Sequence, residues 1–133
     1  EYITHRFLLH PSKKFMRMDR WAHFAHGKHH DEPDNRVFAL VPPLNSMMIF
    51  IPLLAIFRLI VPHYAVAVFT GFFLVGYLAY EYIHISLHHA APKTHLGRYF
   101  RSHHLTHHAH GCEGNFGVST PLWDFLLGSR LRN

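Results

Sequence analysis

Two long uncharged runs constrain this chain more than any other feature of its sequence. Residues 37–57 and 59–80 contain no Asp, Glu, Lys or Arg over 21 and 22 positions, and only Arg58 separates them. An apolar helix of about 20 residues spans the hydrocarbon core of a bilayer. The pattern therefore predicts an integral membrane helical hairpin with legs at residues 37–61 and 64–83.

A pair of buried core helices in a soluble protein is the alternative explanation of these runs. Helices of that kind usually keep one polar face, whereas the stretch MMIFIPLLAIF at residues 47–57 is apolar on every side. A chain of 133 residues also has little other material with which to cover two such helices. The membrane hairpin is therefore the favoured interpretation.

The rest of the chain favours a single all-α domain. A length of 133 residues suits one domain. Alternation of polar and apolar residues, which would indicate strands, is scarce. The sequence opens at Glu1 inside what reads as a helix, so we expect one or more N-terminal membrane segments to precede this domain at residues 1–133.

Positive charge is concentrated at one end of the predicted hairpin. Of the 13 Lys and Arg residues, all but Arg58 lie before residue 37 or after residue 80. Both flanks of a hairpin that crosses and returns lie on one side of the bilayer, and an excess of Lys and Arg marks the cytoplasmic side. We therefore expect an integral multi-pass membrane protein with cytoplasmic flanks. No nucleic-acid partner is expected, because the basic residues alternate with membrane segments instead of lining one soluble face.

Histidine is unusually frequent, with 16 residues against 13 Lys plus Arg. The spacing HxxHH starts at His26 and again at His104, and HxxxH starts at His84. On a helix, offsets of three and four residues place imidazoles on one face, close enough to bind one metal or two adjacent ones. His5 and His10 stand five apart and converge only if the helix ends or distorts between them.

The number of imidazoles says more about the metal than their type does. Imidazole binds zinc, iron, copper and nickel alike. Ten histidines at motif positions exceed the four that close a structural zinc site and the three of a catalytic zinc site, and they suffice for two metals. A pair of ferrous ions that binds O2 is the sharper hypothesis, and a di-zinc hydrolytic site is the alternative.

Four stretches together resemble the fatty acid hydroxylase superfamily, the integral membrane group that includes fatty acid 2-hydroxylases and sterol desaturase-like oxidases. The stretches are HGKHHDEPDNR, YEYIHISLHH, HHLTHH and NFGVSTPLWD. The resemblance runs nearly end to end, from His5 to Trp123. It implies an all-α integral membrane fold whose cytoplasmic helices carry a histidine-rich dimetal site.

In that family the motifs HxxxxH, HxxHH, HxxxH and HxxHH hold the two metals. The metal ligands that the resemblance implies are His5, His10, His26, His29, His30, His84, His88, His104, His107 and His108. His103 is an alternative ligand in place of His104. His104 is preferred because only His104 starts a complete HxxHH motif. Candidates to hydrogen-bond the second nitrogens of these imidazoles are Tyr80, Glu81, Asp31 and Asp124, with helix capping or surface exposure as the alternative for the acids.

The resemblance implies O2-dependent hydroxylation of a lipid acyl chain, as in a fatty acid 2-hydroxylase. Two iron ions are the implied cofactor, with zinc as the alternative occupant, and O2 is the co-substrate. A separate electron donor, cytochrome b5-like or a ferredoxin, is the implied partner. The alternatives are a sterol or carotenoid hydroxylase or desaturase of the same superfamily, and a non-oxidative zinc-binding membrane protein.

Overall fold

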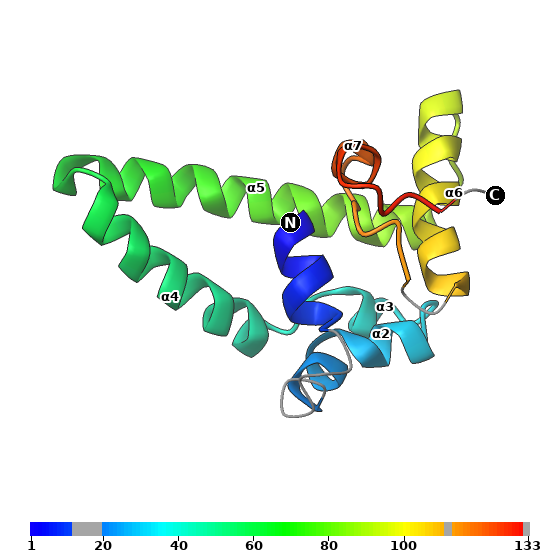
Figure 1. The fold of residues 1–133 in the computed structure, drawn as a ribbon, viewed down its shortest axis with the longest axis horizontal. Coiled ribbons are helices and arrows are strands. Elements are labelled where there is room, and N and C mark those ends of the chain that lie inside the picture. Colours follow the sequence, from blue (N-terminus) through cyan, green and yellow to red (C-terminus); the bar gives the residue numbers. More distant parts are fainter. Residues whose placement is uncertain (12–19, 111–112, 132–133) are drawn as a thin grey trace.

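A computed structural model describes residues 1–11, 20–110 and 113–131 of the chain (Figure 1). In chain order the helices are η1 (Thr4–Leu9), η2 (His23–Gly27), α2 (Lys28–Asp31), α3 (Arg36–Ala39), α4 (Pro43–Ile60), η3 (His63–Ala65), α5 (Val66–His89), α6 (His95–Ala109) and α7 (Leu122–Leu126). Of these, η1 and η2 are π-helices and η3 is a single 3₁₀ turn. No strand occurs among the described residues, so the prediction of an all-α fold is confirmed.

Helices α4 and α5 form the two long arms of a hairpin, which meet at the turn around Pro62 and diverge toward the other helices (Figure 1). They belong to two segments that are long and apolar enough to cross a membrane, Arg36–Ile60 and His63–His89, with mean hydropathies of 1.9 and 1.5. Only 6% of each apolar stretch is buried. Core helices of a soluble protein would be buried, so this exposed apolar surface favours lipid as the surroundings of both arms.

Side chains from facing positions hold the two arms together. Near the turn, the rings of Phe57 and Phe69 lie edge to face with their centroids 4.1 Å apart. Farther along, the hydroxyl groups of Ser46 and Tyr77 are hydrogen-bonded at 2.7 Å. Where no water competes, such a polar pair fixes how the two helices align.

The first uncharged run is not one continuous helix, because a break near its start separates two helices. Helix α3 ends at Ala39, and regular helix resumes only at Pro43. Proline disfavours helical conformation in the residue before it but suits the first turn of a helix, so the consecutive prolines Pro42 and Pro43 separate the two helices. The second arm instead continues past residue 83 to His89 without interruption.

The remaining helices gather around the C-terminal end of α5, where the interior is polar. Of the eight largest fully buried side chains, five are histidines. The buried apolar residues near them include the small side chains of Ala22, Ala25 and Ala39. Burying polar groups is unfavourable unless they bind a partner. An interior of this composition therefore points to a ligand that the histidines share.

The π-helical form of η1 brings its two histidines to one side. The amide of His10 donates to the carbonyl of His5 at 3.0 Å, a bond that spans five residues instead of the four of an α-helix. Residues five apart therefore face the same way, and the ring centroids of His5 and His10 lie 4.8 Å apart. This is the helix distortion that convergence of the pair requires.

The hydrogen bond between the arms makes a measurable contribution to stability. Replacing Tyr77 by Phe should lower the free energy of unfolding by about 0.6 kcal/mol, and by no more than about 1.7 kcal/mol, because it removes one interhelical hydrogen bond in the apolar region. Thermal or denaturant unfolding in detergent micelles measures the change. Tyr82→Phe is the matched control, since Tyr82 lies on the same helix and is 74% exposed. Equal losses in the two variants would contradict this role of Tyr77.

Candidate metal centre

Ten histidines converge beside the C-terminal end of α5 in two groups of five, with one nitrogen of each ring within 4.8 Å of those of the other four. The first group consists of His5, His10, His26, His30 and His107. The second group consists of His29, His84, His88, His104 and His108. The structure thus places all ten histidines of the predicted motifs in these groups. His63 lies away from them, exposed at the tip of the hairpin.

Each HxxHH motif divides its histidines between the two groups. On α6, His104 and His108 belong to the second group and His107 belongs to the first. The motif that starts at His26 divides in the same way. Residues four apart stay together because they lie one above the other on a helix. The two groups adjoin, since the rings of His30 and His108 stack with their centroids 4.1 Å apart.

The ring nitrogens approach one another as ligands of a common ion do. In the first group, Nε2 of His5 lies 3.0 Å from Nε2 of His26 and 3.1 Å from that of His10. In the second, the Nε2 atoms of His88 and His104 are 2.8 Å apart. Imidazole nitrogen lies about 2.0–2.1 Å from bound zinc, so ligands at right angles are about 3 Å apart and opposite ligands about 4.2 Å apart. Each group therefore has the dimensions of a site for one ion.

Unpartnered nitrogens in the second group support the same conclusion. Both ring nitrogens of His29 are buried without a hydrogen-bond partner among the described residues. A buried polar atom in that state costs about 1–3 kcal/mol. A bound metal satisfies one nitrogen of each ring, so the residues present fit a metal in each group.

Burial keeps these imidazoles uncharged, which is the form that binds metal. It lowers the pKa of His10 to about 3, with repulsion from His107 as the second cause, and it lowers the pKa of His107 to about 4. Burial likewise holds the pKa well below its ordinary value in His5, His26 and His104. At neutral pH few protons therefore compete with a metal for these nitrogens.

Main-chain carbonyls hold the outer nitrogens of two histidines of the first group. Nδ1 of His5 donates to the carbonyl of Phe116 at 2.6 Å, and Nδ1 of His107 donates to the carbonyl of Gly114 at 2.6 Å. A proton fixed on Nδ1 leaves the lone pair on Nε2, which points into the group. Sequence reasoning missed both acceptors because a main-chain carbonyl has no residue signature. The stretch NFGVSTPLWD was singled out by its family resemblance and by Asp124, and neither feature points to the carbonyl of Phe116.

Two of the predicted hydrogen-bonding side chains lie on α5 beside the second group. The ring of Tyr80 packs against that of His84 with their centroids 5.7 Å apart. The carboxylate of Glu81 accepts a long hydrogen bond of 3.4 Å from the amide of Val41, so it joins α5 to the segment that precedes α4.

The other two predicted side chains contact histidines outside both groups. Asp31 is exposed and lies 3.8 Å from Nε2 of His23, which is also exposed. Asp124 is fully buried and accepts a hydrogen bond of 3.0 Å from Nε2 of His103. Burial raises the pKa of Asp124, but hydrogen bonds from His103, Ser129 and two main-chain amides outweigh it and hold the pKa below its ordinary value. In this structure His103 is therefore the partner of Asp124, and His104 lies in the second group.

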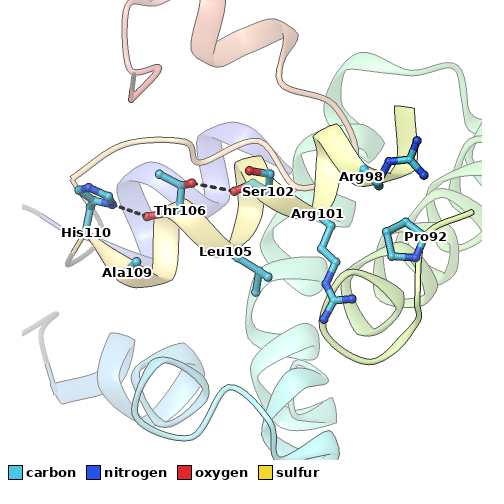
Figure 2. A pocket seen from close by; sticks show the side chains of 8 residues that line it. All are labelled: Pro92, Arg98, Arg101, Ser102, Leu105, Thr106, Ala109 and His110. Atoms are coloured by element: carbon cyan, nitrogen blue, oxygen red, sulfur yellow. Dashed lines mark hydrogen bonds between the residues drawn. The ribbon is translucent and has the colours of Figure 1, made fainter. Parts of the chain in front are cut away.

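A shallow hollow lies against α6, and Figure 2 shows the residues that line it. Its lining includes Arg98, Arg101 and His110. The guanidinium of Arg101 donates to the carbonyls of Ala90 at 3.0 Å and His88 at 3.2 Å. It thereby provides hydrogen-bond donors for carbonyls at the C-terminal end of α5, which have no partner within the helix. At about 100° per residue, the lining positions of α6 fall on the face opposite its grouped histidines. The hollow is therefore separate from the metal groups.

Residues 1–129 match the family described as fatty acid hydroxylase. The chain belongs to this family. The resemblance that the histidine motifs indicated is thereby confirmed.

Named members of the fatty acid hydroxylase family share about a third of the residues. A dihydroceramide fatty acyl 2-hydroxylase of Arabidopsis thaliana is 30% identical, with the match covering 97% of this chain and 54% of the relative. A fatty acid 2-hydroxylase of Homo sapiens is 35% identical, over 96% of this chain and 35% of the relative. This chain therefore spans about half the length, or less, of the curated relatives it matches.

A solved structure described as full-length scs7p, with only its hydroxylase domain visible, has the same fold. The TM-score is 0.87 at 30% sequence identity, and the match covers 98% of this chain and 50% of that one. The helical hairpin and the histidine-bearing helices are therefore the architecture of a membrane hydroxylase domain.

The lowered pKa values predict that the metal-free protein loses stability in acid. The folded state keeps His10 and His107 uncharged down to pKa values of about 3 and about 4, whereas in the unfolded chain each titrates near 6.5. Below pH 6.5 the unfolded state therefore binds more protons, so the stabilisation is complete above that pH and is lost as the pH falls toward 4.

Thermal unfolding in detergent with a chelator, at pH 7.5 and at pH 5.5, measures this loss. His63→Asn is the control and should show the same decrease as the wild type, because His63 lies outside both groups. A metal-free protein that is equally stable at the two pH values would contradict the prediction.

Proposed function

We propose that the two histidine groups hold a di-iron centre at which O2 hydroxylates the acyl chain of a lipid. The observation that carries the proposal is the position of ten buried and half-buried imidazoles, in two adjoining groups, at the end of an apolar helix of membrane length. The activities by which two relatives are named, fatty acid 2-hydroxylase and dihydroceramide fatty acyl 2-hydroxylase, support an acyl substrate oxidised at carbon 2.

The donor set and the reaction both favour iron over zinc. Five imidazoles in each group exceed the three of a catalytic zinc site and the four of a structural one. Hydroxylation of a C–H bond is an oxidation, and zinc has no redox chemistry. Ferrous ions held by the two groups would supply electrons and open coordination positions for O2.

The two arms support a lipid chain as the substrate. Apolar side chains of α5 face outward, with Phe72 76% exposed and Leu78 64% exposed. Leu78 precedes His84 by six residues, which is about 9 Å along a helix axis. An acyl chain lying along this arm would therefore extend from the apolar region toward the second group.

The position of the groups also suits carbon 2. That carbon is next to the carbonyl at the head of a fatty acyl chain, so it lies near the surface of a bilayer. His84 and His88 stand at the end of α5 that joins the polar helices, beyond its apolar part. The reacting carbon then needs to move only a short way out of the lipid, while burial of the imidazoles keeps water from the centre.

In this proposal the protein crosses the membrane more than once and carries the metal groups on the cytoplasmic side. The distribution of Lys and Arg in the sequence supports that orientation. Hydroxylation by O2 inserts one oxygen atom into the C–H bond and reduces the other to water, which consumes two electrons. The proposal therefore includes a separate redox protein, cytochrome b5-like or a ferredoxin, as the electron donor.

Ligand substitutions test the proposed centre. His107→Ala and His84→Ala each remove one histidine from a different group, and each should lower the yield of hydroxylated lipid at least about 100-fold. His63→Ala should retain the wild-type yield because His63 is exposed at the tip of the hairpin. Lipid mass spectrometry of cells that express the full-length variants measures the product, and metal analysis of the purified proteins measures the iron.

Two outcomes would contradict the proposed function. One is an active His107→Ala variant. The other is a purified protein that holds two zinc ions and forms no O2-dependent product with iron, a reductant and an electron donor present.

A further inference from the structure

One short segment holds two histidines of the first group. The carbonyls of Gly114 and Phe116 accept the Nδ1 protons of His107 and His5, which come from opposite ends of the chain. Both bonds are 2.6 Å long and lie in the buried interior. The positions of the two imidazoles therefore depend on where the main chain of residues 114–116 lies.

The carboxylate of Asp124 fixes that main chain. Its two oxygens accept hydrogen bonds from the amides of Phe116 and Gly117, both at 2.7 Å. It also accepts from the hydroxyl of Ser129 at 2.7 Å and from His103 at 3.0 Å, and it is 0% exposed. Each carboxylate oxygen thus has two donors, so the segment is held by charge-assisted hydrogen bonds in a buried place.

The close approach to Asp124 requires glycine at position 117. A Cβ there would lie 2.8 Å from a carboxylate oxygen of Asp124 and would collide with the carbonyl of Thr120. The stretch NFG in the sequence is therefore explained by this contact.

Asn115 ties the same segment to α6. It adopts a left-handed conformation with φ of 55°, which asparagine tolerates better than most residues. Its side chain donates to the carbonyl of His103 at 3.0 Å and accepts from the amide of Leu131 at 2.8 Å. The carbonyls of the segment are thus held in register with the helix that carries His107.

Several ring nitrogens of the second group lack such support. Nδ1 of His104 and Nδ1 of His108 are buried without a hydrogen-bond partner among the described residues, as are both nitrogens of His29. The two groups therefore differ in how firmly the surrounding protein orients their imidazoles.

We propose that Asp124 is a positioning residue for the first group and not for the second, and that it acts through the main chain of residues 114–117 on His5 and His107. The proposal rests on the proposed function only in that each group binds a metal. Asp124 does not itself touch a metal or substrate. It acts on the two metal positions unequally, because both imidazoles that this main chain holds from behind, His5 and His107, belong to the first group.

Asp124→Asn tests this role in the full-length protein, loaded with ferrous iron without oxygen and then exposed to a chelator. All four partners of the Asp124 carboxylate are hydrogen-bond donors, and the NH2 group of asparagine cannot accept from them. The segment therefore loses at least one hydrogen bond, and the negative charge of Asp124 is removed. We expect the wild type to bind two irons per chain. In the variant the affinity of one position should fall about 10- to 100-fold, with faster release of one iron, while the other iron is released at the wild-type rate.

Combined variants show which position is affected. His107→Ala removes one histidine of the first group and should prevent that group from holding its iron. In this background, Asp124→Asn should not change the release rate of the iron held by the second group. His104→Ala removes one histidine of the second group and should prevent that group from holding its iron. In this background, Asp124→Asn should accelerate release of the iron held by the first group. Glu113→Gln is the matched control, because it removes one negative charge from an exposed side chain next to the same segment and should leave both release rates unchanged.

Ser129→Ala provides a second test of the positioning role of Asp124 if the Asp124→Asn variant does not fold. It removes one of the four hydrogen bonds to the carboxylate and keeps the two main-chain amides. It should accelerate release of the same iron by about 2- to 10-fold.

Three results would overturn parts of this inference in distinguishable ways. Two unchanged release rates, or two rates raised equally, would exclude a positioning role confined to the first group while leaving the di-iron proposal standing. A wild-type protein that binds fewer than two irons would overturn both the di-iron proposal and this inference.

Discussion

Ten imidazole rings occupy the place that apolar side chains take in the interior of an ordinary helical domain. Burial lowers the pKa of His10 and His107 and so keeps them neutral, and several buried ring nitrogens, among them both of His29, have no hydrogen-bond partner among the described residues. Each buried nitrogen without a partner costs about 1–3 kcal/mol. The helices η1, η2, α2, α5 and α6 therefore pack together favourably only when the rings share something else. The proposed metal positions and the packing of this end of the molecule therefore depend on the same ten rings.

Two kinds of surroundings meet along α5. Its first part is apolar and exposed, with Phe72 and Val75 facing outward, and its last turns carry buried Glu81, His84 and His88. No break in the helix separates the two parts. The continuous helix therefore holds a polar centre at a constant depth relative to the apolar region, which is what the proposed reaction at one carbon of a lipid chain requires.

The hairpin and the histidines of the HxxHH and HxxxH motifs were predictable because both are periodic or compositional, whereas His5 and His10 were added only by the family resemblance. An uncharged run of membrane length is visible in any sequence, and HxxHH shows its helical spacing directly. The break at Pro42 was harder to anticipate, because proline is also tolerated inside membrane helices. The partners of His5 and His107 were not predictable, since carbonyls occur at every residue. Asp124 was a candidate to hydrogen-bond a ligating imidazole, but in the structure it accepts from His103, outside both groups, and its other partners depend on a loop that folds back through Asn115 at positive φ.

The division of each HxxHH motif between the groups has a consequence for the distance between the two positions. His29 and His30 are consecutive but serve different groups, and so do His107 and His108. Their ring centroids are 5.8 Å and 5.7 Å apart, nearly the same on two separate helices. Consecutive Cα atoms are always about 3.8 Å apart. Each of the two helices therefore carries both groups on neighbouring residues, so small movements of the helices against each other change these two ring separations little.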